Sequence, residues 1–154
     1  MSATSAFIMT DRRGSRPANR RMLAACRAVG ALFLVSAGIH IGIASAGPQT
    51  YRHFADQSPI PLVQNLWSDV FMAHPTAWGF AVAIGELVIG LLILSAGRWL
   101  QWGLAAAIGF HVALMLFGFG FWLWSLPMLA VLIAMFVATA NLDYSPRSQG
   151  GDSS

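Results

Sequence analysis

The sequence predicts an all-α membrane protein, a bundle of four transmembrane helices, and three observations lead to that prediction. The 154 residues are 56% hydrophobic and 10% charged, whereas a soluble domain carries roughly 25% charged residues. The apolar residues gather into four runs of about 20 residues, the helical length that crosses a hydrocarbon core of about 30 Å. The basic residues are all arginines, and six of the nine precede the first apolar run.

The four predicted spans occupy residues 28–46, 76–96, 99–117 and 122–140. Pro75 precedes the second span, at a position where a helix start tolerates proline. Together the spans form a transmembrane domain over residues 27–140. On either side, the Arg-rich residues 1–26 and the Gly-, Ser- and Pro-rich residues 141–154 lack an apolar period, which predicts two disordered cytoplasmic tails.

The longer connection, residues 47–75, contains a short amphipathic pattern. Its apolar residues recur at helical spacing, with polar residues between them. A helix of this length, about three turns, is too short to span a bilayer. We therefore expect an amphipathic helix in the first extracytoplasmic loop, which lies on the outer leaflet or covers the bundle. The apolar residues are Leu62, Val63, Leu66, Trp67, Val70 and Phe71.

The arginine distribution predicts the orientation of the bundle. Four spans place both termini on one side, and eight arginines then lie on that side, with Arg52 alone opposite. Cytoplasmic segments carry the excess of basic residues, so both termini are predicted to be cytoplasmic. An arginine block beside a span also matches lipid headgroups better than nucleic acid, which we do not expect as a partner. Tryptophans at the predicted interfaces support the boundaries: Trp99 and Trp102 on the inner side, and Trp78, Trp122 and Trp124 on the outer side.

One alternative concerns the first span. Ala44-Ser45-Ala46 resembles the small-residue cleavage site of a secretory signal. Cleavage there would leave three spans. The C-terminus would then no longer lie on the same side of the membrane as the Arg-rich N-terminal segment. The preceding segment is unusually long for a signal, and His40 interrupts the apolar stretch, so the uncleaved four-span reading is favoured.

Three ionisable residues lie within the predicted spans: His40, Glu86 and His111. With a rise of about 1.5 Å per residue, all three fall near one depth, slightly outside the midplane. A carboxylate there costs at least ~2.5–3.5 kcal/mol, so apolar partitioning does not explain Glu86. Small residues flank each of the three, and small faces let transmembrane helices approach closely. We therefore expect all three to point into the bundle, with Glu86 within hydrogen-bond or one-water reach of a histidine.

The cluster is compatible with more than one role. It can fix the register of the helices as a structural contact, or it can handle protons, as intramembrane ionisable groups often do. A metal or haem site is disfavoured because no paired-histidine or Cys-rich spacing accompanies the cluster. The lone Cys26 excludes both an internal disulfide and a CxxC redox pair. No metal is predicted.

Two segments carry a resemblance to a known family. Arg27 precedes a first span that leads to Gly38-Ile-His40, and the second span contains Gly85-Glu86 followed by Gly90 and Leu94. This combination resembles the DoxX and DoxX-like family of small four-helix bacterial membrane proteins. The resemblance implies a four-helix bundle in the bacterial plasma membrane and an association with thiol, sulfur-compound or quinone redox metabolism. The residues that match the family are Arg27, His40 and Glu86, whereas the segments 51–56 and 110–124 do not follow its pattern.

The sequence leaves several functions open, and it does not decide whether the chain is an enzyme. The first is an accessory subunit of redox metabolism, with quinone as the candidate cofactor, although no residue pattern requires one. The second is a non-catalytic scaffold that recruits another membrane or redox protein. The third is a small channel or transporter, for which four spans are few unless the chain forms a homo-oligomer. No nucleophile triad, phosphate-binding loop or cysteine pair indicates a self-contained enzyme of the soluble type.

Overall fold

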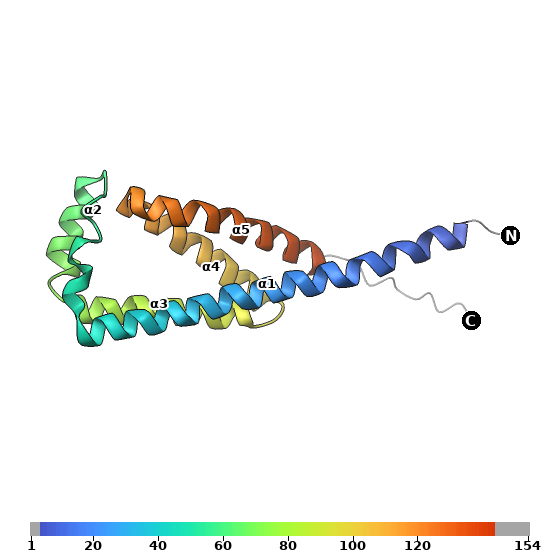
Figure 1. Cartoon of the computed structure of the whole chain (residues 1–154), viewed down its shortest axis with the longest axis horizontal. Coiled ribbons are helices and arrows are strands. Elements are labelled where there is room, and N and C mark those ends of the chain that lie inside the picture. The colour runs from blue at the N-terminus through green and yellow to red at the C-terminus, as the bar shows by residue number, and fades with distance from the viewer. Residues whose placement is uncertain (1–3, 144–154) are drawn as a thin grey trace.

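The computed structural model describes the backbone of residues 4–143 and the side chains of residues 20–140. Every regular element in this part of the chain is a helix (Figure 1). Four of these helices are long and apolar enough to cross a membrane. The predicted all-α class and the four helices of membrane-spanning length are therefore confirmed for the described residues. They are α1 (Thr4–Ala46), α3 (Pro75–Leu94), α4 (Arg98–Leu114, continued by the 3₁₀ turn η3, Met115–Phe117) and α5 (Phe119–Asp143).

The first helix begins earlier than the sequence predicts. Instead of a disordered tail up to residue 26, α1 includes residues 20–26, and Cys26 lies in the buried core at 2% exposure. The physical reason is local propensity: Met22-Leu23-Ala24-Ala25 are strong helix formers. Adding residues to an existing helix avoids the nucleation cost. At the other end, α5 continues to Asp143, and the predicted tails at 1–3 and 144–154 lie outside the described residues.

The long helices form two antiparallel pairs, α1 with α3 and α4 with α5, joined through the contact of α3 with α4. Figure 1 shows the pairs meeting near the C-terminal end of α5 and diverging toward the opposite end of the molecule. Phe33, Ile93, Leu104 and Leu132 form part of the buried core between them. The pairs therefore enclose a wedge that is packed at its narrow end.

Glycines allow the backbones of neighbouring helices to touch. A β-carbon on Gly90 of α3 would lie 3.0 Å from the carbonyl oxygen of Gly30 on α1. A β-carbon on Gly103 of α4 would lie 2.6 Å from the backbone nitrogen of Ile93 on α3. Such close approach is the usual role of small residues between membrane helices. The contacts of α3 with both α1 and α4 thus depend on residues without side chains.

The two short turns also use glycine. Gly97, between α3 and α4, has φ 62°, and Gly118, before α5, has φ 102°. Residues with a β-carbon rarely adopt these left-handed values, so glycine is the residue that fits both turns. α3 ends at Leu94, two residues before the predicted end of the span, and its C-cap Ser95 has an extended backbone.

The wide end of the wedge is covered by the connection between α1 and α3. It contains the 3₁₀ helix η1 (Pro48–His53), the short α2 (Pro61–Leu66) and the π-helical turn η2 (Trp67–Phe71). Figure 1 shows this segment crossing the end of the molecule where the pairs diverge. We call residues 48–71 the cap.

Polar and aromatic contacts attach the cap to the turn between α4 and α5. The Ser58 hydroxyl donates to the carbonyl oxygen of Leu116 at 2.6 Å, and the Gly120 amide donates to the Gln57 side chain at 3.1 Å. The Trp67 ring meets Phe117 edge-on, with centroids 5.0 Å apart. The cap, which connects α1 to α3, is therefore also bonded to the α4–α5 pair and closes the wedge at this end.

Candidate functional site

A cavity of about 380 Å³ occupies the wide part of the wedge beneath the cap. Its walls are mainly apolar and come from α1, α3, α4, α5 and the cap. Leu32, Val35 and Ile39 on α1 and Trp124 on α5 line it while being 41–60% exposed, so the cavity opens sideways between these two helices. Its polar or ionisable lining residues are Ser36, His40, Tyr51, Glu86 and His111.

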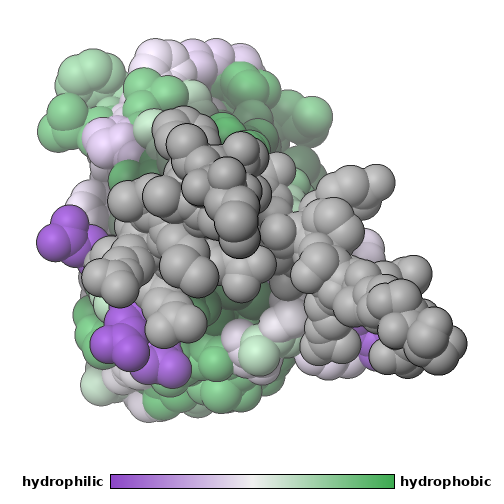
Figure 2. Space-filling model, turned by 90° about the vertical axis from the view of Figure 1, so that its right-hand side faces the viewer, coloured by the Kyte–Doolittle hydropathy of each residue, from purple (hydrophilic) through white to green (hydrophobic). Residues whose placement is uncertain are grey.

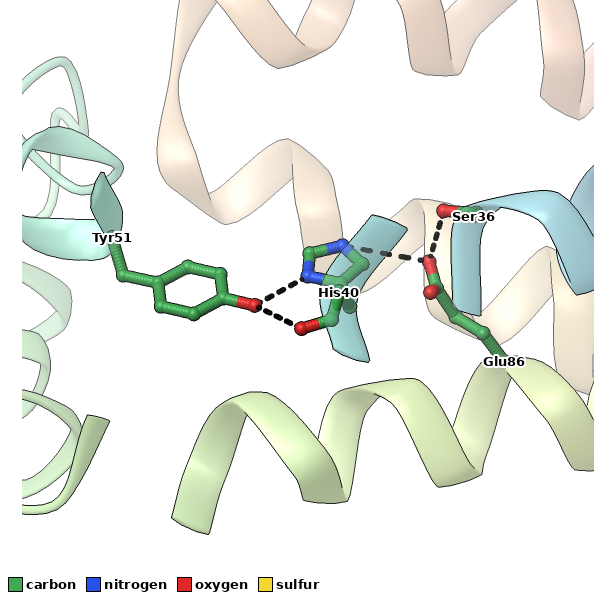
Figure 3. Close-up of polar contacts among 4 residues, drawn as sticks. All are labelled: Ser36, His40, Tyr51 and Glu86. Atoms are coloured by element: carbon green, nitrogen blue, oxygen red, sulfur yellow. Dashed lines mark hydrogen bonds and ion pairs between the residues drawn. The ribbon is translucent and has the colours of Figure 1, made fainter. Parts of the chain in front are cut away.

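Glu86 lies on the cavity side of α3 and is 2% exposed. The Ser36 hydroxyl donates to Glu86 Oε1 at 2.7 Å, and His40 Nε2 lies 3.8 Å from the same oxygen (Figure 3). The second distance is longer than a direct hydrogen bond but short enough for an ion pair. The other oxygen, Oε2, is buried without a hydrogen-bond partner, which is costly for a polar atom.

His40 connects Glu86 to the cap. Its Nδ1 lies 2.8 Å from the Tyr51 hydroxyl, and the two rings stack with an interplanar angle of 3°. The same hydroxyl also lies 3.4 Å from the His40 carbonyl oxygen. Figure 3 shows the resulting row of side chains, from Tyr51 through His40 to Glu86.

Tyr51 itself is held in place by the cap. It is 1% exposed, and its carbonyl oxygen accepts a hydrogen bond from Trp67 Nε1 at 2.8 Å. Burial raises the pKa of the Tyr51 phenol, and the negative charge of Glu86 raises it further. Tyr51 therefore presents a neutral hydroxyl to His40.

His111 lines the same cavity from α4 but makes different contacts. It is 4% exposed, and its Nδ1 lies 3.0 Å from the Ala107 carbonyl oxygen. Since a carbonyl can only accept, Nδ1 carries the hydrogen. The ring packs edge-on against Phe33 and Phe110. Among the described side chains, Glu86 contacts His40 and Ser36, and it makes no hydrogen bond or ion pair with His111.

The structure therefore brings the three predicted residues to one cavity and pairs two of them. The sequence pattern assigned no role to Ser36 or Tyr51, which the structure adds to the site. Within residues 20–140, no three His, Cys, Asp or Glu side chains gather closely enough to hold a metal ion. The five predicted interface tryptophans are 37–65% exposed, and one of them, Trp124, also lines the cavity. They are Trp78, Trp99, Trp102, Trp122 and Trp124.

Comparisons with protein-family models, with curated proteins and with solved structures find no match for this chain. The resemblance to the DoxX family, carried by Arg27, His40 and Glu86, therefore stays a prediction. Function is argued below from the geometry of the cavity.

Proposed function

We propose that the chain is a multi-pass protein of the bacterial plasma membrane, with both termini in the cytoplasm. The helices expose large apolar side chains, such as Val35 at 60%, Ile84 at 61% and Leu123 at 74%. Soluble proteins rarely expose apolar surface on this scale. Figure 2, which views the molecule from the right-hand side of Figure 1, shows hydrophobic side chains on the upper and lower flanks and a group of hydrophilic ones on one side. This surface suits hydrocarbon, and the arginine count supports the orientation.

We further propose that the chain is a DoxX-like accessory subunit of redox metabolism that binds a lipophilic quinone. The observation that carries this proposal is the cavity, which is apolar, opens sideways and contains a buried carboxyl group with one unpartnered oxygen. Ligand sites typically combine apolar walls with a few placed polar groups. A molecule dissolved in the bilayer can enter between α1 and α5 without crossing water.

The polar residues fit a quinone headgroup. Phe33, Phe110 and Phe121 supply aromatic walls for a planar ring. Protonated Glu86 can donate to a ring carbonyl, and ionised Glu86 can accept from a ring hydroxyl. Bound quinone would supply two-electron redox chemistry, with the electrons coming from a partner redox protein. Glu86 would hold a proton at one ring oxygen.

The test is purification from native membranes followed by organic extraction and an absorption spectrum. We expect quinone to co-purify with the native chain, and the Glu86→Gln variant to fold but retain less of it. Ser45→Ala is a matched control, because Ser45 is exposed and bonds only to the Ile41 carbonyl oxygen of its own helix. A preparation that holds only bulk phospholipid would contradict the proposal.

A second candidate, a non-catalytic scaffold, is favoured by one observation on the cap. Leu62, Leu66 and Val70 are 64%, 52% and 45% exposed around α2 and η2. This apolar surface suits either the outer leaflet, as an amphipathic helix would, or another membrane protein. A colourless complex with a stoichiometric protein partner would favour the scaffold.

A further inference from the structure

We propose that Tyr51 is a positioning residue that sets the tautomer of His40 and so couples the protonation of Glu86 to the docking of the cap. The inference deepens the proposed function. It rests on that function only for the reaction that would consume the proton, which is the reduction of quinone. It depends on three distances. The Tyr51 oxygen lies 2.8 Å from His40 Nδ1 and 3.4 Å from the His40 carbonyl oxygen, while His40 Nε2 lies 3.8 Å from Glu86 Oε1.

The row of Tyr51, His40 and Glu86 has two protonation states. In the first state Glu86 is ionised. The hydrogen of neutral His40 is then on Nε2, where it faces the carboxylate. The Nδ1 lone pair accepts the hydrogen of the Tyr51 hydroxyl at 2.8 Å. In this state the Tyr51 hydrogen has Nδ1 as its acceptor, and the Nε2 hydrogen faces the carboxylate oxygen at 3.8 Å, since the neutral imidazole has one donor and one acceptor nitrogen.

The second state contains one additional proton, which is held by Glu86. The carboxyl O–H now faces Nε2, so Nε2 must be the acceptor and the His40 hydrogen moves to Nδ1. Nδ1–H donates to the Tyr51 oxygen, and the Tyr51 hydrogen rotates toward the His40 carbonyl oxygen, 3.4 Å away. A hydroxyl can reverse its role in this way because its hydrogen rotates about the C–O bond. Tyr51 thus keeps a hydrogen bond to His40 in both states.

The surroundings contain few other groups that could exchange this proton. The cavity lining contributed by α5, η2 and η3 is aromatic or apolar. α4 contributes His111, whose Nδ1 is bonded to the Ala107 carbonyl oxygen. α1 contributes Ser36, which donates to Glu86 in either state. The raised pKa of Tyr51 keeps its hydroxyl neutral throughout.

The cap controls the switch because Tyr51 belongs to η1. Its carbonyl oxygen accepts from Trp67, and its ring packs edge-on against Phe54 and Phe71, both at centroid distances of 5.3 Å. When the cap shifts, the Tyr51 hydroxyl leaves both of its partners on His40. A partner that binds the cap therefore changes the proton affinity of a carboxyl group inside the bundle.

The test follows His40 and Glu86 together in the purified full-length chain in lipid nanodiscs, without added quinone. Imidazole ¹⁵N shifts, assigned by difference from His40→Gln, report the tautomer. The carboxyl C=O infrared band, assigned by Glu86→Gln, reports protonation. In the native chain we expect the tautomer to change from Nε2–H to Nδ1–H over the pH range in which the carboxyl band appears.

In Tyr51→Phe we expect the loss of this coupled change, with one tautomer across the titration. Ser45→Ala is the matched control, because it also removes one hydroxyl, from an exposed serine of α1 that bonds only to the Ile41 carbonyl oxygen, and it should retain the native behaviour. A coupled change that persists in Tyr51→Phe would overturn the proposal. So would a native His40 whose tautomer never changes, a result that needs no variant to fold. If the coupling is present but no quinone binds, the proposed function fails and this inference stands.

Discussion

Replacement of Gly103 by alanine tests the contact of α3 with α4 that forms one side of the wedge. The added β-carbon would lie 2.6 Å from the Ile93 nitrogen and 2.9 Å from the Leu92 carbonyl carbon. Both are backbone atoms, so they cannot retreat by a rotamer change, and α4 must move away from α3. Overpacking of this kind costs ~1–3 kcal/mol, which lowers the ratio of folded to unfolded protein roughly 5- to 140-fold.

Gly109→Ala on the same helix is the matched control, since no atom lies within 4 Å of its added β-carbon. Alanine stabilises a helix interior by about 0.5–1 kcal/mol relative to glycine. Both variants receive this gain, so the difference between their free energies of unfolding, ~1–3 kcal/mol, isolates the overpacking.

The assay is equilibrium unfolding of both variants in mixed micelles with increasing SDS, followed by circular dichroism. We expect the midpoint of Gly103→Ala to lie well below that of Gly109→Ala. Equal midpoints would refute the close α3–α4 contact and the wedge that depends on it.

Three further predictions follow from the site, the cap and the topology. Glu86→Gln should lower the pKa of Tyr51, because it removes the negative charge that raises this pKa beyond the effect of burial; tyrosinate absorbance, taken by difference from Tyr51→Phe, measures it, and an unchanged value would contradict the short row of side chains. Ser58→Ala should destabilise the docked cap by ~0.5–1.5 kcal/mol, since the part-buried hydrogen bond to the Leu116 carbonyl oxygen is lost; faster hydrogen exchange over residues 48–71 than in Ser68→Ala, at an exposed serine, is the expected result, and equal rates would count against a role of the Ser58 hydrogen bond in holding the cap. A reporter fused after Ser154 should be active only in its cytoplasmic form, and periplasmic activity would invalidate the arginine count as an orientation argument.

The helices were predictable because an apolar run long enough to cross a bilayer has few possible conformations other than a helix. The four runs coincide with α1, α3, α4 and α5, and the depth argument placed His40 and Glu86 at one level, where the structure has them 3.8 Å apart. Both results depend on the constant rise of a helix, which converts residue number into depth.

The remaining features depend on tertiary contacts that a periodic pattern does not contain. Tyr51 reaches His40 because the chain turns back after Ala46 into η1, and hydropathy says nothing about where such a loop docks. Equal depth in the membrane also did not mean that both histidines contact Glu86. His111 faces the cavity, but its Nδ1 bonds to the Ala107 carbonyl oxygen of its own helix. The early start of α1 was missed because the arginines before residue 27 lower the local hydropathy without lowering helix propensity.

The measurement that tests the central claim most directly is quinone binding by two cavity variants on α4. Ala113 lines the cavity, whereas Ala106 is exposed and does not line it. A short-chain quinone is titrated into nanodiscs that contain the native chain, Ala113→Phe or Ala106→Phe, and quenching of tryptophan fluorescence is recorded. The account predicts saturable binding to the native chain and to Ala106→Phe, with at least a tenfold loss of affinity, about 1.4 kcal/mol, in Ala113→Phe. Equal affinity in all three, or no saturable binding to the native chain, would contradict it.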